Sequence, residues 1–393
     1  MTIFTRASRI ADLEISEIVQ LTEKAAALKA AGRDVVALST GEPDFPTPDH
    51  IIEAAHRAAL AGKTRYPATL GTPELRRAIA DGNGVAPANV IVSTGAKQVL
   101  ANAMLASLNE GDEVIMPAPF WTSYSDIVLM AGGRPVVIRC GQEAGFKLSP
   151  SQLEAAITPR TRWLMLNSPS NPSGAIYSAA EIRALAGVLA RHPQVWILSD
   201  EIYDHLSYIP FTPFRQAAPE LAERLLVVNG VSKAYSMTGW RIGWGIGPAD
   251  LIQAMGAVQG QVTSGACSIS QAAALAALTG DQALLDTRLQ AMRARRDRVV
   301  AALNAIPGIR CPEPEGAFYV FPDITGAMKT GGFASDADLC AWLLEDAGVA
   351  IVPGRAFGLP GHARLSFAYG DADLDQGLSR IASAIRARMT ITA

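Results

Sequence analysis

NGVSKAYSMTGWRIGWG, residues 229–245, places Lys233 and Arg241 in a stretch that is otherwise apolar and rich in glycine. A buried ammonium group tends to lose its proton, and a neutral amine is what a Schiff-base lysine requires. An arginine offers several donors in a fixed fork, which suits a phosphate. Spacing alone also allows a surface lysine and a salt-bridged arginine, so the stretch needs support from the rest of the chain.

Apolar strands and helices alternate before this stretch. Strands are predicted at 90–92, 112–116, 134–138, 163–166, 195–199 and 225–228, with helices between most of them. Continuous apolar strands between helices are typical of a largely parallel sheet that helices cover on both faces. The sequence therefore predicts an α/β fold.

Five candidate functional residues follow different predicted strands: Gly95, Trp121, Asn171, Asp200 and Lys233. Ligands of such sheets bind beyond the carboxyl ends of the strands, where these residues should converge. The turn at Gly95 also leads into a helix N-terminus, which can bind an anion, although the Walker spacing is missing. Core packing does not easily explain five such residues at one edge, so we favour a ligand site.

The length of 393 residues favours two domains. A long helical region at 270–305 precedes a smaller α+β unit, with strands at 317–321, 349–352 and 363–366 and helices at 336–347 and 371–388. The amphipathic helix at 13–31 should pack against this unit. We therefore predict a large domain at 45–285 and a smaller, discontinuous α+β domain formed by 1–44 and 286–393.

Composition excludes several classes of protein. Hydrophobic residues make up 49% and charged residues 18%, as in a well-buried enzyme. The net charge of −3 gives no basic face for nucleic acid, and no apolar run reaches the ~20 residues of a membrane helix. Four scattered cysteines without a CxxC pair favour a cytoplasmic protein without zinc or disulfides. No metal site is predicted.

Several motifs occur in an order that resembles a known family. They are GEPDF from Gly41, NSPSNPSG around Asn171, DEIY from Asp200, Lys233 with TGWRIG, and RLS from Arg364. This set resembles the fold-type-I pyridoxal-phosphate aminotransferases, in particular the bacterial aspartate/aromatic group. The resemblance runs from about Ile18 to Ser383, and it implies a large domain with a mostly parallel sheet and a smaller domain.

The resemblance implies roles around a cofactor ring. Lys233 would hold pyridoxal phosphate and move the substrate proton, and Asp200 would pair with the pyridine nitrogen. Tyr203 and Asn171 would donate to the ring hydroxyl, and Trp121 would stack on the ring. Three of these residues have a structural alternative: a helix cap for Asp200, a turn for Asn171 and core packing for Trp121.

The resemblance also implies phosphate and carboxylate subsites. The phosphate would be held by Arg241, Ser232 and the backbone at Gly95, Ala96 and Lys97. Tyr66 would reach the phosphate of a partner subunit, which implies a homodimer with shared active sites. The substrate carboxylate would be bound by Arg364 and by the backbone N–H of Gly41, with Trp121 and Asn171 beside it. An ordinary exposed arginine is the alternative for Arg364.

Three features depart from the family pattern. Gly230 stands where relatives often have serine, and the segment 79–84 is short. Many aspartate-specific relatives have a basic residue near the start, where this chain reads RIADLE at 9–14. A distal substrate carboxylate would lose that cation, and Arg9, Lys97 and Arg134 are candidate substitutes.

The sequence thus predicts an aminotransferase that moves an amino group from an L-amino acid to a 2-oxo acid by a ping-pong route. Aspartate, glutamate and aromatic amino acids are the expected donors, and 2-oxoglutarate is the expected acceptor. The alternatives are a pyridoxal-phosphate lyase that performs β-elimination, a decarboxylating or cyclising enzyme of the same fold, and a non-catalytic regulator that binds the cofactor.

Overall fold

The computed structural model describes residues 4–11, 13 and 15–392. Its main feature is a seven-stranded sheet in the order β2-β8-β7-β6-β5-β3-β4. The strands are β2 (Val90–Thr94), β3 (Glu113–Ala118), β4 (Arg134–Arg139), β5 (Thr161–Asn167), β6 (Trp196–Asp200), β7 (Leu225–Gly230) and β8 (Ile242–Ile246). All neighbours are parallel except β8, which runs antiparallel to both β2 and β7. The predicted α/β fold with a mostly parallel sheet is confirmed.

Strand β8 was not predicted from the sequence. Its residues IGWGI contain two glycines, which usually weaken a strand. A Cβ atom on Gly243 would lie 2.2 Å from the backbone nitrogen of Ala96, so the glycine lets the strand pass close to the next segment. Because β8 runs backwards, Arg241 at its start lies at the same edge as the carboxyl ends of the other strands.

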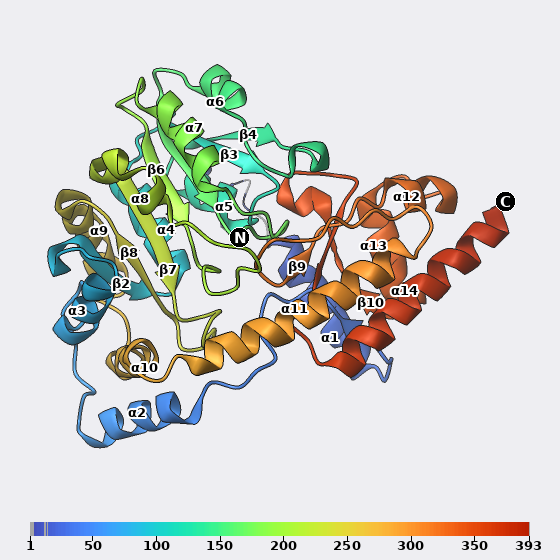
Figure 1. Cartoon of the computed structure of the whole chain (residues 1–393), viewed down its shortest axis with the longest axis horizontal. Helices are drawn as coiled ribbons and strands as arrows, with labels where there is room; N and C mark the ends of the chain where they lie inside the picture. The colour runs from blue at the N-terminus through green and yellow to red at the C-terminus, as the bar shows by residue number, and fades with distance from the viewer. Residues whose placement is uncertain (1–3, 12, 14, 393) are drawn as a thin grey trace.

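Helices cover both faces of the sheet (Figure 1). Successive side chains of β3 pack on opposite faces of the sheet: Ile115 lies on one face, and Val114 and Met116 lie on the other. The face with Ile115 is covered by α3 (Pro73–Gly82), α6 (Pro150–Ala156), α7 (Ala179–Leu189), α8 (Phe214–Ala217) and α10 (Ser268–Thr279). The other face is covered by α4 (Ala96–Ser107), α5 (Ser123–Met130) and α9 (Ala249–Val262). Short 3₁₀ helices occur at Ser8–Ile10, Pro87–Asn89, Gln142–Ala144, Pro219–Arg224 and Gly354–Phe357.

Local sequence sets several helix ends. Ser149 and Ser178 each form a capping box with the residue three positions later, and Pro73 begins α3. The predicted helical region at 270–305 is two helices, because Gly280 ends α10 before α11 (Ala283–Asn304) begins. Helix α2 (Asp49–Leu60) packs against α10 at the lower edge of the molecule in Figure 1.

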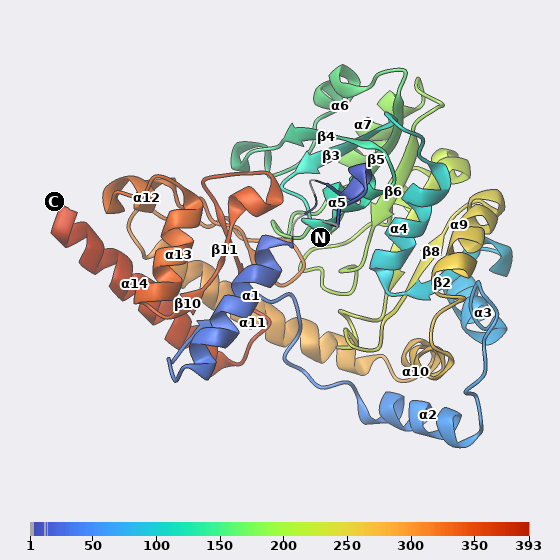
Figure 2. The ribbon, with the colours of Figure 1, turned by 180° about the vertical axis from the view of Figure 1, so that it is seen from behind.

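A second group of elements lies beside the large sheet. Strand β1 (Val36–Ala37) pairs parallel with β10 (Val349–Ala350), while β12 (Ala363–Ser366) lies between β11 (Val352–Pro353) and β9 (Tyr319–Val320) in an antiparallel sheet. Around them lie α1 (Glu17–Ala30), α12 (Thr325–Gly331), α13 (Asp336–Asp346) and α14 (Asp371–Thr392). Helix α1 packs on β10 and β11, and α11 extends towards this group from the large sheet (Figure 2). The exact division at 45 and 285 stays a prediction.

All four cysteines are free thiols. Within the described residues, no helix combines the length and the apolar character needed to cross a membrane. In the same part of the chain, no group of three or more histidine, cysteine and acidic side chains is arranged to hold a metal ion.

Candidate active site

A cavity of about 300 Å³ lies at the carboxyl edge of the large sheet, facing β9 and β12 of the second group. Most of the residues predicted from the sequence line it together. They are Gly41, Ala96, Lys97, Trp121, Asn171, Asp200, Tyr203, Ser232, Lys233, Arg241 and Arg364. Gly95 lies beside the cavity in contact with Arg241, and Tyr66 points to solvent with 92% of its surface exposed.

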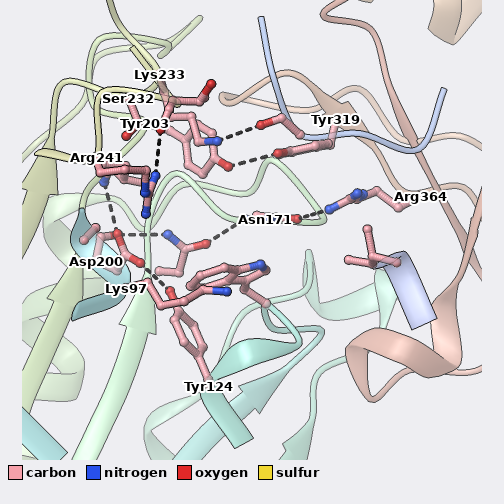
Figure 3. A pocket seen from close by; sticks show the side chains of 17 residues that line it. Lys97, Tyr124, Asn171, Asp200, Tyr203, Ser232, Lys233, Arg241, Tyr319 and Arg364 are labelled. Atoms are coloured by element: carbon pink, nitrogen blue, oxygen red, sulfur yellow. Dashed lines mark hydrogen bonds between the residues drawn. The ribbon is translucent and has the colours of Figure 1, made fainter. Parts of the chain in front are cut away.

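Lys233 follows β7 and projects into the cavity (Figure 3). Its Nζ donates a 2.6 Å hydrogen bond to the carbonyl oxygen of Gly41. Burial lowers the pKa of the amine to about 8, and the positive charges of Arg364 and Arg241 act in the same direction, whereas Glu42 and Asp200 oppose them. The amine is therefore much more readily deprotonated than an ordinary lysine, which supports the functional interpretation of the NGVSK stretch.

Asp200 ends β6 with its carboxylate buried at the cavity. The hydroxyl of Tyr124 donates to Oδ2 at 2.6 Å, and the backbone N–H of Ile202 donates to Oδ1 at 3.2 Å. Burial raises the pKa of Asp200 to about 6, while these hydrogen bonds and Lys233 limit the rise. Asn167 donates to the backbone carbonyl of Asp200 at 2.9 Å and so holds the end of β6 against the end of β5.

Tyr124, Asn167 and Tyr319 also line the cavity, although sequence reasoning did not single them out. Asn167 directly ends β5, so the rule that ligands lie beyond strand ends could have found it. Tyr124 lies three residues after Trp121, and the centres of the two rings are 5.6 Å apart in an edge-to-face arrangement. Tyr319 had no sequence signal, because it lies between two other aromatic residues, Phe318 and Phe321, in a short apolar segment.

Arg364 comes from β12 and is only 2% exposed, which excludes the alternative of an ordinary surface arginine. It donates to Oδ1 of Asn171 at 3.0 Å and to the carbonyl oxygen of Ser39 at 2.5 Å. Its buried Nε has no hydrogen-bond partner within the described residues. Burial lowers the pKa of Arg364 from its ordinary value. A buried cation with an unused donor is well suited to bind a carboxylate.

Arg241 and the start of α4 form the opposite end of the cavity. Arg241 has φ of 56°, a left-handed conformation that is uncommon for a residue with a side chain. Gly95 has φ of 81°, and a Cβ atom there would lie 2.3 Å from a guanidinium nitrogen of Arg241. The glycine therefore gives the arginine its place beside the N-terminus of α4, where Lys97 adds a second positive charge.

The three candidate substitutes for an N-terminal cation have different outcomes. Lys97 lines the cavity with Nζ 4.8 Å from the centre of the Trp121 ring. Arg134 is not a candidate, because it begins β4 at the opposite edge of the sheet and pairs there with Glu113 at 2.5 Å. Within the RIADLE segment, residues 12 and 14 and the side chain of Arg9 lie outside the part of the chain that the structure describes.

Comparison with known proteins agrees with this geometry. The family model of class I and II aminotransferases matches residues 33–381. The chain is 54% identical to the aspartate/prephenate aminotransferase of Cereibacter sphaeroides, over 95% of this chain and 96% of the relative. It is 53% identical to an aspartate aminotransferase of Rhizobium meliloti, over 97% and 96% of the two chains.

Solved structures give the same result. The crystal structure of an aspartate aminotransferase from Rhizobium meliloti matches with a TM-score of 0.94 and 52% identity, covering 98% of this chain and 99% of that chain. The Thermus thermophilus aspartate aminotransferase with maleate matches with a TM-score of 0.91 and 41% identity, covering 97% and 100%.

The fold and the cavity thus define a transaminase of the α/β class. The chain belongs to the class I and II aminotransferase family. The predicted enzyme class, amino-group transfer to a 2-oxo acid, is confirmed by these relatives.

Proposed function

We propose that this aminotransferase binds pyridoxal 5'-phosphate at Lys233 and uses it to exchange amino groups between L-amino acids and 2-oxo acids. The observation that carries the proposal is the buried amine of Lys233, whose pKa is about 8, facing Asp200 across the same cavity. When bound, pyridoxal phosphate supplies an electron-accepting ring next to the substrate Cα. The residues present fit such a group at both ends of the cavity.

The phosphate fits the end formed by Arg241, Ser232 and the first backbone N–H groups of α4. Burial lowers the pKa of Lys97, and the nearby charge of Arg241 lowers it further, so this end of the cavity favours a bound anion. A helix N-terminus adds favourable backbone donors and dipole. Gly95 keeps these groups close together, as its contact with Arg241 shows.

The ring end fits the groups on β5 and β6. Asp200 would pair with a protonated pyridine nitrogen, and the hydrogen bond from Tyr124 favours the ionised carboxylate that this pairing needs. Tyr203 and Asn171 would donate to the ring hydroxyl; the Oδ1 of Asn171 accepts from Arg364, which leaves its Nδ2 as the donor. Trp121 would cover the ring and exclude water. The amine of Lys233 would move the proton between the substrate Cα and C4′ of the cofactor.

The substrate carboxylate would lie against Arg364 and the backbone N–H of Gly41. For a second, distal carboxylate, Lys97 is the candidate cation that the structure places in the cavity. The relatives named for aspartate and prephenate support dicarboxylic substrates. We therefore propose aspartate and glutamate as donors, with 2-oxoglutarate as acceptor, and aromatic amino acids as further donors.

We also propose a homodimer in which Tyr66 reaches the phosphate of the partner subunit. In the single chain Arg241 is exposed at the phosphate end, and Tyr66 and Leu60 are 92% and 75% exposed. A partner would cover these groups and complete the site.

Mixing Tyr66→Phe chains with Lys233→Ala chains should restore activity, because one of the two sites in the hybrid would be intact. Failure of mixed chains to recover activity would contradict shared sites. A cytoplasmic location stays a prediction.

Absorption spectroscopy tests the cofactor assignment. The purified protein should show a visible band, which aspartate or glutamate should deplete and 2-oxoglutarate should restore. Lys233→Ala should lose the band, whereas Lys329→Ala, an exposed lysine on α12, should keep it. A spectrum that no amino acid changes would refute the proposal. Release of ammonia and pyruvate-type products without an acceptor would instead identify a β-eliminating lyase.

A further inference from the structure

Tyr319 is a buried phenol that connects the two groups of elements around the cavity. It lies on β9 opposite Ser366 of β12, so it shares a face of that sheet with Arg364. Its hydroxyl lies 3.0 Å from the hydroxyl of Tyr203, which belongs to the segment after β6. The side chain is 1% exposed. Figure 3 shows Tyr319 and Tyr203 joined by this hydrogen bond at one side of the cavity.

The ring of Tyr319 supports the guanidinium group of Arg364. The guanidinium carbon lies 4.6 Å from the centre of that ring and 4.9 Å from the centre of the Phe357 ring. Two aromatic faces therefore restrict the plane of the cation, which matters for bidentate binding of a carboxylate. Both rings belong to the same group of elements as Arg364 itself.

The hydroxyl of Tyr319 also approaches the segment that contacts Lys233. A Cβ atom on Gly41 would lie 2.3 Å from that hydroxyl, so glycine is the residue that allows the approach. The carbonyl oxygen of Gly41 accepts the hydrogen bond from Nζ of Lys233. One phenol thus contacts or adjoins three groups assigned to the cofactor and the substrate: Tyr203, Arg364 and Gly41.

We propose that Tyr319 is a positioning residue that couples the carboxylate subsite at Arg364 to the ring-hydroxyl donor Tyr203. This inference rests on the proposed function of the cavity and deepens it. A hydroxyl can donate one hydrogen bond while it accepts another. When Tyr203 donates to the ring hydroxyl of the cofactor, Tyr319 donates in turn to the oxygen of Tyr203. Such a chain strengthens each of its hydrogen bonds in a buried setting.

The coupling has two separable parts, which two substitutions can distinguish. Tyr319→Phe removes the hydroxyl that supports Tyr203 and keeps the ring beneath Arg364. Tyr319→Leu removes both. Tyr208→Phe is the matched control, because Tyr208 is also buried and its hydroxyl donates to the carbonyl oxygen of Ala317 at 2.6 Å, away from the cavity.

The first measurement is the pH midpoint of the visible absorption band of the protein with pyridoxal phosphate bound. Weaker donation from Tyr203 leaves more negative charge on the ring oxygen, so the neighbouring proton at the Lys233 nitrogen is held to higher pH. The midpoint should rise by about half a pH unit in Tyr319→Phe, the size expected when one hydrogen bond weakens. It should stay at the wild-type value in Tyr208→Phe.

The same substitution in a Tyr203→Phe background tests the route of the effect. There the additional change from Tyr319→Phe should disappear, because the residue through which it acts is gone. An unchanged midpoint in Tyr319→Phe, or a full shift that persists without the Tyr203 hydroxyl, would overturn the inference. Absence of any visible band in the wild type would instead refute the proposed function.

The second measurement is the affinity for maleate, a dicarboxylate without an amino group. Tyr319→Phe should bind it within about twofold of the wild type, since the cation keeps its aromatic face. Tyr319→Leu should bind it roughly threefold to thirtyfold more weakly, the range expected for a lost cation–π contact. Thermal unfolding of each variant shows that it is folded. Wild-type maleate affinity in a folded Tyr319→Leu protein would overturn the carboxylate half of the inference.

Discussion

Asp200→Asn should stabilise the protein without cofactor at neutral pH while weakening its hold on pyridoxal phosphate. Burial raises the pKa of Asp200 from 3.8 to about 6, so the folded protein disfavours the ionised carboxylate. A rise of about two units corresponds to about 3 kcal/mol of lost stability once the group is ionised. Asparagine carries no charge and so avoids this cost of ionisation. It offers one acceptor oxygen fewer, however, which is a loss of about 1 kcal/mol. A net gain of about 2 kcal/mol is therefore expected.

The stability difference between the wild type and Asp200→Asn should depend on pH, because Asp200 titrates. A carboxylate with a raised pKa in the folded state contributes most to stability below pH 3.8, and that contribution is lost as pH rises through about 6. Asparagine does not titrate. The advantage of Asp200→Asn should therefore grow between about pH 4 and pH 6 and stay constant above pH 7.

Denaturant unfolding of the two proteins without cofactor, from pH 4 to pH 8, measures this difference. Asp250→Asn, which changes an exposed carboxyl, is the control for loss of one charge. Addition of pyridoxal phosphate should reverse the order, because only the wild-type carboxylate can pair with a protonated ring nitrogen. A stability difference that does not vary with pH, or a variant that stays the more stable protein with saturating cofactor, would refute the reasoning.

Three further substitutions test the other subsites. Gly95→Ala should weaken cofactor binding about tenfold or more, because the added Cβ would displace Arg241. Gly111 has a similar φ of 82° with open space around it, so Gly111→Ala should leave cofactor binding unchanged. Arg364→Lys should raise KM for amino and oxo acids by about a hundredfold in steady-state assays, because lysine cannot bind a carboxylate bidentately; an unchanged KM would contradict the assigned subsite. Lys97→Met should lower kcat/KM for aspartate by about tenfold and for phenylalanine by less than about twofold, and an equal loss for both would exclude a distal-carboxylate role.

The sequence predicted the site residues that directly follow the carboxyl ends of parallel strands. It was less informative where a strand runs in the opposite direction, or where the residues in contact are distant in the sequence. Asp200 and Lys233 were found because their strands are apolar and uninterrupted. The two glycines of β8 concealed a strand, so the reason why Arg241 reaches the same edge appeared only with the structure. Arg134 was a plausible cation by charge alone, but its position at the start of a parallel strand places it at the wrong edge.

Two of the three missed residues were missed for the same physical reason. Tyr124 and Tyr319 are hydrogen-bonded to Asp200 and Tyr203, partners that are distant in the sequence. A tyrosine in a helix or a short strand normally indicates core packing, and only its partner shows another use. Residues whose partners are other site residues are therefore harder to predict than residues at strand ends, because they need no special spacing relative to the motifs.

The reversal of β8 has a consequence for how the protein should respond to protease. Residues 231–241 leave the sheet after β7 and return to it at β8, with Lys233 near one end of the excursion and Arg241 at the other. A ligand attached to the amine and bound by the guanidinium would tie the two ends together. Under the proposed function, removal of pyridoxal phosphate should make this segment an early cleavage site, and bound cofactor should protect it.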